Sequence, residues 1–408
     1  MALQKWYQGN LSLERKQEES FQMKKRLGVI FVLVMTVFIG FGVIIPILPE
    51  VLPPRHLGWL LALYSLASFV MSPLWGALSD RIGRKPVIMI GALGFSVSFF
   101  LFGMFLDTLW VLYVSRILGG LFSGAVTSCA MAYVADSTDE EHRTRSMGMI
   151  GMAIGFGFII GPAVGGLLSV ISYQIPFFVA SSLALVTMFF TFTALEESLD
   201  PEQRRLLAAS QDNTSRWKAF SGPLKYLYLL SFFVSFTLAG LESTLLYFLK
   251  TIFPMTTRDF GILLLINGLA GALVQGGVVR RFVHKGRENA VIHIGLALSA
   301  AGFFLLLVTT GFATATLYVC VFGVGNALIR PCVLSLITQK TTVGQGVATG
   351  LSSSMDSLGR IVGPLFGTYL FTAGPSIPFV ANGILCIAAF GLLYGFIIQD
   401  RKRAAELV

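Results

Sequence analysis

Long apolar stretches with almost no charged residues recur along the chain from Leu27 to Ile398, and short polar segments separate them. The hydrocarbon core of a membrane is about 30 Å thick, so a helix that crosses it needs about 20 apolar residues. The pattern therefore predicts an all-α integral membrane protein with twelve transmembrane helices. Their expected extents are residues 27–49, 57–79, 86–106, 109–135, 145–169, 174–195, 225–250, 259–279, 290–310, 314–338, 346–372 and 376–398.

The composition agrees with a chain whose solvent is lipid. Hydrophobic residues make up 55% of the 408 positions and charged residues only 12%, which is too few for a protein that faces water on all sides. The four cysteines all fall within predicted spans, with no CxxC pair or histidine cluster near them. Neither a disulfide framework nor a metal site is therefore expected.

The formal net charge of +9 is spread over alternate loops and does not form a patch that would bind nucleic acid. With a cytoplasmic N-terminus, most of the 30 lysines and arginines fall on the cytoplasmic side. The positive-inside rule then places both termini in the cytoplasm. Residues 1–26 are polar and lack the apolar core of a signal peptide, so they and residues 399–408 are expected to form cytoplasmic tails.

A single long polar stretch, residues 196–224, divides the spans into six and six. It is expected to be a cytoplasmic linker between an N-terminal six-helix bundle, residues 27–195, and a C-terminal one, residues 225–398. The fifth span of each half carries the same string, at Gly157, Gly161, Pro162 and Gly165 and again at Gly359, Gly363, Pro364 and Gly367. Two repeated halves are typical of secondary transporters, which handle their substrate at the midplane between the halves.

The loop between the second and third spans reads GALSDRIGRKP and is short and basic. Its residues suggest a conformational latch: Gly76 and Gly83 allow helices to approach closely, and Asp80 can face a helix N-terminus. Arg84 can reach a carboxylate, for which Asp136 at the end of the fourth span is the candidate. The alternative is that the basic residues of this loop only set the orientation in the membrane.

This loop resembles the signature loop of the major facilitator superfamily, Gly-x-Leu-x-Asp-Arg-x-Gly-Arg-Lys. Arg116-x-x-Gly119-Gly120 resembles the buried-arginine motif of that superfamily, and the Gly-Pro string of the fifth span, extended to Gly166, resembles the antiporter signature of drug exporters. Over residues 27–398 the chain is similar to the twelve-helix bacterial drug:proton antiporters of the NorA and Bmr type. The resemblance implies a multi-pass protein of the bacterial cytoplasmic membrane, without enzymatic activity, that confers antibiotic resistance by multidrug efflux.

Acidic residues inside the spans are the candidates for proton coupling. An ionisable group at the centre of a membrane costs at least about 2.5 kcal/mol, so its presence there indicates function. Of the 21 acidic residues, only Glu242 and Asp356 lie well inside apolar spans. Glu242 coincides with the position at which the resembled exporters place a coupling carboxylate, and a carboxylate among apolar groups takes up a proton more readily than one in water. The alternative for Glu242 is a polar residue that only ties helices together.

The sequence departs from its relatives in the tenth span. Some resembled exporters carry a second carboxylate three residues before the arginine of this span, Arg330, where this chain has Ala327. Asp356 either replaces that acid or forms an i,i+4 salt bridge with Arg360. Arg330 and Arg116 are both expected to be buried, either to relay the protonation state or to tie helices together. The buried charge of Arg116 is expected to face a carboxylate, carbonyl groups or a hydrated cavity.

Four apolar residues, Phe38, Phe41, Ile45 and Phe158, match positions that the resembled exporters use for drug contact. Together with Asn326 they are expected to line a substrate cavity. An apolar, aromatic pocket with one acid suits lipophilic cations, because cation–π and charge attraction act together without demanding one shape.

We therefore expect export of lipophilic, often cationic drugs in exchange for protons by alternating access. The partners would be small lipophilic substrates, protons and membrane lipid, and a monomer would suffice. The proton gradient would drive transport without a cofactor, since the sequence contains no GxxxxGK[ST] loop. The alternatives are a proton-coupled transporter of a specific metabolite, such as a sugar or siderophore, and a membrane enzyme or receptor. The last class would need a catalytic constellation at membrane depth, whereas the four histidines lie in loops or near helix ends.

Overall fold

The computed structural model describes residues 2–138, 140–199, 222–279, 281, 286–341 and 345–406, and within these ranges it contains twelve α-helices and no strand. The first six are α1 (Ala2–Val51), α2 (Pro54–Ile82), α3 (Arg84–Met104), α4 (Leu109–Ser137), α5 (Glu140–Leu168) and α6 (Ile175–Ala194). The other six are α8 (Leu224–Ile252), α9 (Thr257–Leu273), α11 (Glu288–Leu306), α12 (Phe312–Lys340), α13 (Gln345–Ala373) and α14 (Ile377–Glu406), and a π-helical segment, η2 (Val274–Val279), continues α9. All twelve helices predicted from the apolar pattern are confirmed, while the expected linker, residues 196–224, lies largely outside the described residues.

Eleven of the described helices are long and apolar enough to cross a membrane. The remaining helix, α13, has 29 residues and is long enough, but a run of serines around Asp356 makes it less apolar. It packs against α2 and against α8, where Ser352 and Asp356 each meet a polar side chain of α8. In α1 the apolar span begins at Lys25, and the preceding residues, expected as a tail, continue the same helix.

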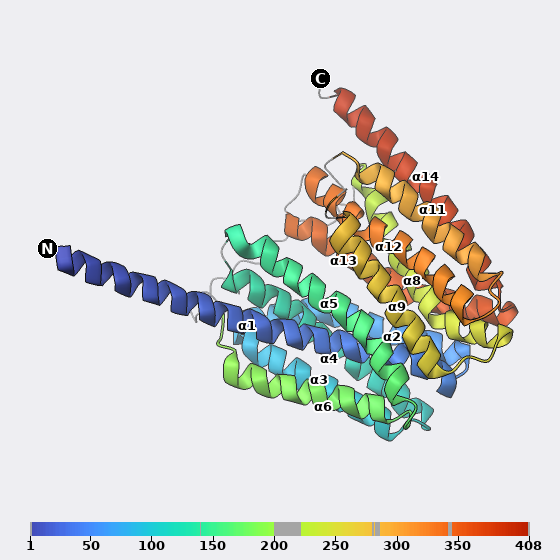
Figure 1. The fold of residues 1–408 in the computed structure, drawn as a ribbon, viewed down its shortest axis with the longest axis horizontal. Coiled ribbons are helices and arrows are strands. Elements are labelled where there is room, and N and C mark those ends of the chain that lie inside the picture. The colour runs from blue at the N-terminus through green and yellow to red at the C-terminus, as the bar shows by residue number, and fades with distance from the viewer. Residues whose placement is uncertain are drawn as a thin grey trace.

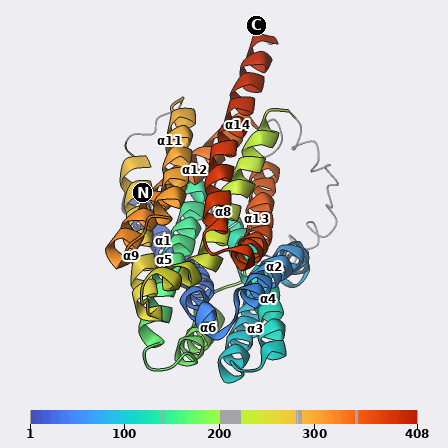
Figure 2. The ribbon, with the colours of Figure 1, turned by 90° about the vertical axis from the view of Figure 1, so that its right-hand side faces the viewer.

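The twelve described helices form two groups of six with corresponding contacts. Figure 1 shows the two groups from one side and Figure 2 from another. In the first half α1 packs on α5, α2 on α4, and α3 on α4 and α6. In the second half α8 packs on α13, α9 on α12, and α11 on α12 and α14. The second half therefore repeats the helix packing of the first.

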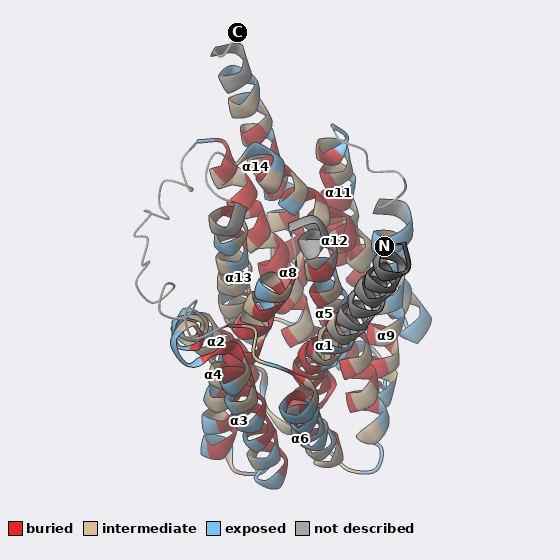
Figure 3. Ribbon diagram, turned by 90° about the vertical axis from the view of Figure 1, so that its left-hand side faces the viewer, coloured by how far each residue is buried: buried red, intermediate tan, exposed pale blue. Residues whose placement is uncertain are grey.

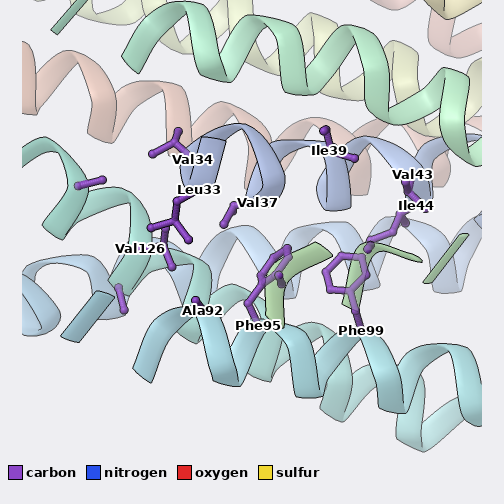
Figure 4. Packing of buried hydrophobic residues seen from close by; sticks show 14 of the residues in the cluster. Leu33, Val34, Val37, Ile39, Val43, Ile44, Ala92, Phe95, Phe99 and Val126 are labelled. Carbon is purple, nitrogen blue, oxygen red and sulfur yellow. The ribbon is translucent and has the colours of Figure 1, made fainter. Parts of the chain in front are cut away.

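The core of the first half lies between α1, α3 and α4. Gly40 of α1 leaves room for the rings of Phe95 and Phe99, which point from α3 towards Val37 and Ile44 (Figure 4). Buried residues follow the inner sides of the helices and exposed ones the outside (Figure 3). Many exposed side chains are large and apolar, such as Phe189 of α6 and Tyr394 of α14, as a lipid environment requires.

The repeated Gly-Pro strings hold the first and fifth helix of each half in backbone contact. A Cβ atom at any of the string's glycines would lie within 2.4–3.1 Å of a carbonyl oxygen of the neighbouring helix. Only glycine permits this approach, which supplies the close packing that holds helices together in lipid. The contacts are Gly157, Gly161 and Gly165 of α5 with Met35, Ile39 and Val43 of α1, and Gly359, Gly363 and Gly367 of α13 with Phe232, Phe236 and Gly240 of α8.

These contacts also define which residues of the two halves correspond. Gly157 corresponds to Gly359, and continuing by one residue along both helices makes Phe158 the counterpart of Arg360. Likewise Val43 of α1 corresponds to Gly240 of α8, so that two residues further on Ile45 is the counterpart of Glu242.

The two halves meet through two equivalent helix crossings, α2 with α13 and α5 with α9. A Cβ atom at Gly58 of α2 would lie 2.1 Å from Thr368 Oγ1 of α13, and one at Gly261 of α9 would lie 3.0 Å from the Cα of Gly166 in α5. All four residues lie near the helix ends remote from the chain termini, which we call the closed end. Towards the termini the two groups of helices diverge (Figure 1).

Candidate functional site

Glu242 of α8 is a partly buried acid at the boundary between the halves. Within the described part of the chain it accepts no hydrogen bond and forms no ion pair. The charge that acts on it most directly is that of Arg360, from α13 of the same half. A carboxylate that is neither exposed to bulk water nor paired is available to exchange a proton or to meet a cation.

Arg360 reaches across the boundary to two aromatic rings of the first half. Its guanidinium carbon lies 4.7 Å from the ring centre of Phe158 in α5 and 5.8 Å from that of Phe41 in α1. Because Arg360 and Phe158 are counterparts in the two repeats and touch each other, they lie at the approximate two-fold axis that relates the halves. The contact therefore lies at the centre of the interface that must change when the halves move.

An aromatic cluster of the first half surrounds this contact. Ring centres of Phe38 and Phe158 are 5.1 Å apart, those of Phe41 and Phe158 5.5 Å, and those of Phe41 and Tyr64 5.4 Å. Such spacings are those of directly contacting rings. Phe38, Phe41 and Phe158, predicted to line a substrate cavity, thus contact one another, and that they line a cavity stays a prediction. Tyr64 of α2 is a member of the cluster that the sequence did not indicate.

The other two residues predicted to line a substrate cavity are not members of this aromatic cluster. Ile45 is buried among apolar residues of the second half, including Leu241 and Leu245 of α8. Asn326 of α12 donates from Nδ2 to the carbonyl oxygen of Val234 in α8, at 3.3 Å. Ile45 therefore adjoins the site, whereas the contact recorded for Asn326 is a tie between two helices of the second half.

Among the described residues Asp356 does not pair with Arg360, one turn further along α13, which was one of the two alternatives for it. Its Oδ2 atom pairs with Arg330 of α12 at 3.1 Å, and its Oδ1 atom accepts a hydrogen bond from Ser235 of α8 at 2.8 Å. Arg330, expected to be buried, has 47% of its side chain exposed. The salt-bridge alternative for Asp356 is therefore not realised, because an acid on one helix can turn to a neighbouring helix. The expectation that Arg330 is buried was wrong, and its pairing with Asp356 leaves Arg360 free for the rings.

Arg116 of α4 is buried as predicted, with 1% of its surface exposed. Its guanidinium carbon lies 4.6, 4.9 and 5.4 Å from the ring centres of Phe102, Phe99 and Tyr64, and two of its nitrogens have no hydrogen-bond partner among the described residues. The sequence argument required a carboxylate, carbonyls or water around this charge. Aromatic faces take their place here through cation–π contact.

The basic loop between α2 and α3 forms the one contact that was predicted for a latch, the pair of Arg84 with Asp136. Arg84 Nε lies 2.9 Å from Asp136 Oδ2 in α4, and Arg84 Nη1 lies 2.7 Å from Asp80 Oδ1. Gly83 turns the chain between the helices with φ at 106°, a conformation that favours glycine. Nothing lies within 4 Å of a Cβ atom at Gly76, so this glycine does not serve a close approach here. The role of these contacts as a conformational latch stays a prediction.

At the N-terminus of α3 it is Glu197, and not Asp80, whose carboxylate faces the free N–H groups. Its carboxylate accepts hydrogen bonds from the backbone N–H groups of Arg84 and Lys85, at 2.8 and 3.2 Å. A carboxylate at this place satisfies the free N–H groups and the positive end of the helix dipole. The segment after α6 is thereby fixed to the start of α3, which no local pattern could indicate.

At the closed end, polar contacts join the halves. Glu50 of α1 forms an ion pair with Lys250 of α8 and accepts a hydrogen bond from Thr257 Oγ1 of α9 at 2.9 Å. The hydroxyl of Tyr247 donates to the carbonyl oxygen of Leu52. These residues form a cross-half lock, which sequence reasoning missed because its members are distant in the chain.

Comparison with known proteins places these features in context. The family model described as Major Facilitator Superfamily matches residues 30–345 and 286–407. Multidrug resistance protein 2 of Bacillus subtilis is 32% identical over 386 residues, which cover 91% of this chain and 96% of that protein. Multidrug resistance protein 1 of the same organism is 32% identical, covering 84% and 88%. The quinolone resistance protein NorA of Staphylococcus aureus is 28% identical, covering 89% and 94%.

Two solved structures have the same fold. The human organic anion transporter MFSD10 (TETRAN) has a TM-score of 0.68 at 24% identity and covers 91% of this chain and 99% of its own. A bacterial homologue of the human lysosomal transporter Spinster, in an inward-facing and unoccupied conformation, has a TM-score of 0.73 at 15% identity, covering 94% and 98%. At these identities the likeness shows the arrangement of the helices alone.

Proposed function

The chain belongs to the major facilitator superfamily, and from this we propose that it is a secondary active transporter that exports lipophilic, often cationic drugs in exchange for protons. One observation carries the proposal: Glu242, which has no ion pair among the described residues, lies within electrostatic reach of Arg360, and Arg360 stacks on an aromatic cluster at the boundary between two repeated halves. The multidrug and quinolone resistance proteins among its relatives support drugs as the cargo.

The orientation in the membrane follows from the charges. Most of the 30 lysines and arginines fall in the segments that the sequence predicts on the same side of the membrane as both termini, so we place that side in the cytoplasm. The halves are joined at the opposite end, through Gly58, Gly261 and the lock around Glu50. The structure then corresponds to a state that takes up its cargo from the cytoplasmic side.

The transport cycle uses Glu242 for both drug and proton. In the state open to the cytoplasm, deprotonated Glu242 attracts a lipophilic cation, and the rings of Phe38, Phe41 and Phe158 stack on it. Rocking of the halves breaks the cross-half lock and opens the closed end. Protonation of Glu242 from outside removes the attraction and releases the drug, after which the protonated carrier returns and discharges its proton inside.

The remaining assignments belong to the same proposal. The proton gradient supplies the driving force, so no cofactor, enzymatic step or nucleic-acid partner is needed, and one chain contains both halves of the transport path. The second candidate, a proton-coupled transporter of a specific metabolite such as a sugar or siderophore, uses the same fold. It is favoured only if no lipophilic cation is transported.

Proton movement in inverted membrane vesicles tests the proposal. The vesicles carry an interior-acid gradient that a pH-sensitive dye reports, and ethidium or another lipophilic cation is then added. We expect the wild type to release protons on addition of the drug, Glu242→Gln to abolish this release, and Glu242→Asp, which keeps the acid, to retain part of it.

Two results would redirect the proposal. Release that survives in Glu242→Gln moves the coupling site to Asp356. No release by wild type across a varied panel of drugs contradicts multidrug exchange and favours the specific metabolite.

A further inference from the structure

The buried-arginine motif of α4 has no part in the transport cycle proposed above, yet its three defined residues all adjoin one residue, Tyr64 of α2. The guanidinium carbon of Arg116 lies 5.4 Å from the centre of the Tyr64 ring. A Cβ atom at Gly119 would lie 3.4 Å from Cε2 of this ring, and one at Gly120 would collide with the carbonyl oxygen of Tyr64. The motif thus forms a seat for Tyr64, with glycine where the backbones of α2 and α4 approach and a cation against the ring.

The charge of Arg116 and the ring of Tyr64 stabilise each other. Arg116 is 1% exposed, and among the described residues no acid pairs with it and two of its nitrogens have no hydrogen-bond partner. A buried charge without an acid depends on other sources of attraction, which the faces of aromatic rings supply. Tyr64 is itself only 6% exposed. Its ring is therefore held in one orientation by close packing and by the adjacent cation.

Tyr64 also contacts Phe41 of α1, which belongs to the proposed drug site. The two ring centres are 5.4 Å apart, and Phe41 lies 5.5 Å from the ring centre of Phe158 and 5.8 Å from the guanidinium carbon of Arg360. Phe41 is only partly buried and packs against apolar residues of the second half. A chain of contacts therefore runs from Arg116 through Tyr64 and Phe41 to the boundary between the halves.

We propose that Tyr64 is the positioning residue of the aromatic surface: the buried-arginine motif holds Tyr64, and Tyr64 fixes the orientation of Phe41 beside Arg360. A binding surface keeps one geometry only when the rotamers of its side chains are locked by the residues behind them. Tyr64 does not touch the cargo and acts only through Phe41. The proposal rests on the function proposed above and adds to it a role for a motif that lies outside the drug site.

A label on the Phe41 ring tests the positioning without any drug. 4-Cyanophenylalanine is placed at position 41 of the full-length protein in lipid nanodiscs, and the width of its nitrile infrared band reports how many orientations the ring samples. Tyr64→Phe keeps the supporting ring and should leave the width unchanged, whereas Tyr64→Leu should broaden the band. The control is Tyr133→Leu, at another buried tyrosine of the same half, whose hydroxyl donates to the carbonyl oxygen of Glu196.

Two results would overturn the positioning role. One is an unchanged band in Tyr64→Leu, and the other is equal broadening in Tyr133→Leu, because any loss of packing in this half would then disturb Phe41. Arg116→Gln removes the cation that holds the Tyr64 ring and should broaden the band as well. It decides the question if Tyr64→Leu does not give folded protein, and an unchanged width in Arg116→Gln would overturn the role of the motif.

Binding of ethidium to the same protein, followed by its fluorescence, tests whether Tyr64 acts through Phe41. Phe41→Leu and Tyr64→Leu should each weaken binding about three- to tenfold, the range for one cation–π contact. The double variant should bind no more weakly than Phe41→Leu alone. Losses that multiply in the double variant would mean that Tyr64 acts on the cargo by another route, and would overturn the proposal.

The two measurements also separate this inference from the proposed function. Broadening in Tyr64→Leu, in a protein that binds neither ethidium nor any other lipophilic cation of a varied panel, would support the positioning and contradict the proposed cargo. Binding that Phe41→Leu weakens and Tyr64→Leu leaves unchanged would support the cargo and overturn the positioning.

Discussion

At position 158 the first half has a phenylalanine in α5, and at the corresponding position the second half has Arg360 in α13; the two side chains stack on each other at 4.7 Å. The same division holds on the first helix of each half, where Ile45 corresponds to Glu242. The packing is repeated down to the glycine contacts, but the chemistry is not. The repeat serves the movement of two similar bodies, while one half supplies aromatic surface and the other supplies charge.

At the end that carries the chain termini, the contact between the third and fourth helix also differs between the halves. In the first half, Arg84 at the start of α3 pairs with Asp136 near the end of α4. In the second, Glu288 at the start of α11 accepts a hydrogen bond from the neutral Gln339, at the same place in α12, at 2.8 Å. The charged contact of the predicted latch is thus present in one half and replaced by a weaker one in the other.

The largest expected effect concerns the unequal pair Ile45 and Glu242. Glu242→Gln should lower proton-coupled drug transport by on the order of 100-fold or more, because the group that carries the proton is lost. Ile45→Val, at the corresponding position of the first half, should change transport less than about twofold, since it only trims a packed side chain. Initial rates of drug uptake into inverted vesicles measure both. Similar losses in the two variants would remove the division between the halves.

The next effect tests what the halves share. Gly161→Val and Gly363→Val should each destabilise the protein by about 1–3 kcal/mol, because the new side chain meets the backbone of α1 or α8. Thermal unfolding in detergent, followed by tryptophan fluorescence, measures this. Gly151→Val, also on α5 but with nothing within 4 Å of its Cβ position, is the control. A strong effect in only one half would contradict equivalent packing.

The two contacts at the ends that carry the termini should differ in strength. Asp136→Asn removes a charged partner of the buried Arg84 and should cost about 1.5–3 kcal/mol. Glu288→Gln alters hydrogen bonds with neutral donors, the Gln339 side chain and the Gly286 N–H, and should cost about 1 kcal/mol. The same thermal measurement compares them, and equal costs would show that charge is not what distinguishes the halves here.

A smaller effect is expected from the aromatic surface. Phe158→Leu keeps an apolar residue but removes the ring, and should weaken binding of a lipophilic cation by about three- to tenfold, since a cation–π contact contributes about 0.5–2 kcal/mol. Phe156→Leu, on the same helix with 47% of the residue exposed, should leave affinity unchanged. Titration of dye fluorescence measures both, and unchanged affinity in Phe158→Leu would place the cargo elsewhere.

The smallest effect belongs to the cross-half lock. About one-third of the Lys250 side chain, 35%, is exposed, so its ion pair with Glu50 is weak. Lys250→Ala should therefore shift the equilibrium towards the state in which the halves separate at the closed end by no more than about 1 kcal/mol. Spin-label distances between the α1–α2 and α13–α14 connections should show a larger outward-open population. Thr251→Ala, a neighbour whose hydroxyl bonds only to its own helix backbone among described contacts, is the control.

The sequence by itself determined the twelve helices, the repeat and the acid at membrane depth. These follow from the length of apolar stretches, from a string found twice and from the rarity of charge among apolar residues, all of which are local properties. Glu242 could be named for the same reason, whereas Asp136 was only the candidate partner of Arg84 until the structure brought the two together. The signature loop and the Gly-Pro string also made the superfamily recognisable.

Only the tertiary structure decided which side chains meet. Asp356 turns to Arg330 instead of Arg360, rings surround Arg116 where an acid or water was expected, and Glu197 reaches the start of α3. In each case the partners lie on different elements, and their contact depends on how each helix is rotated about its axis and how the halves are tilted. A pattern read along the chain fixes which face of a helix is apolar, but packing selects the neighbour of each polar group on that helix.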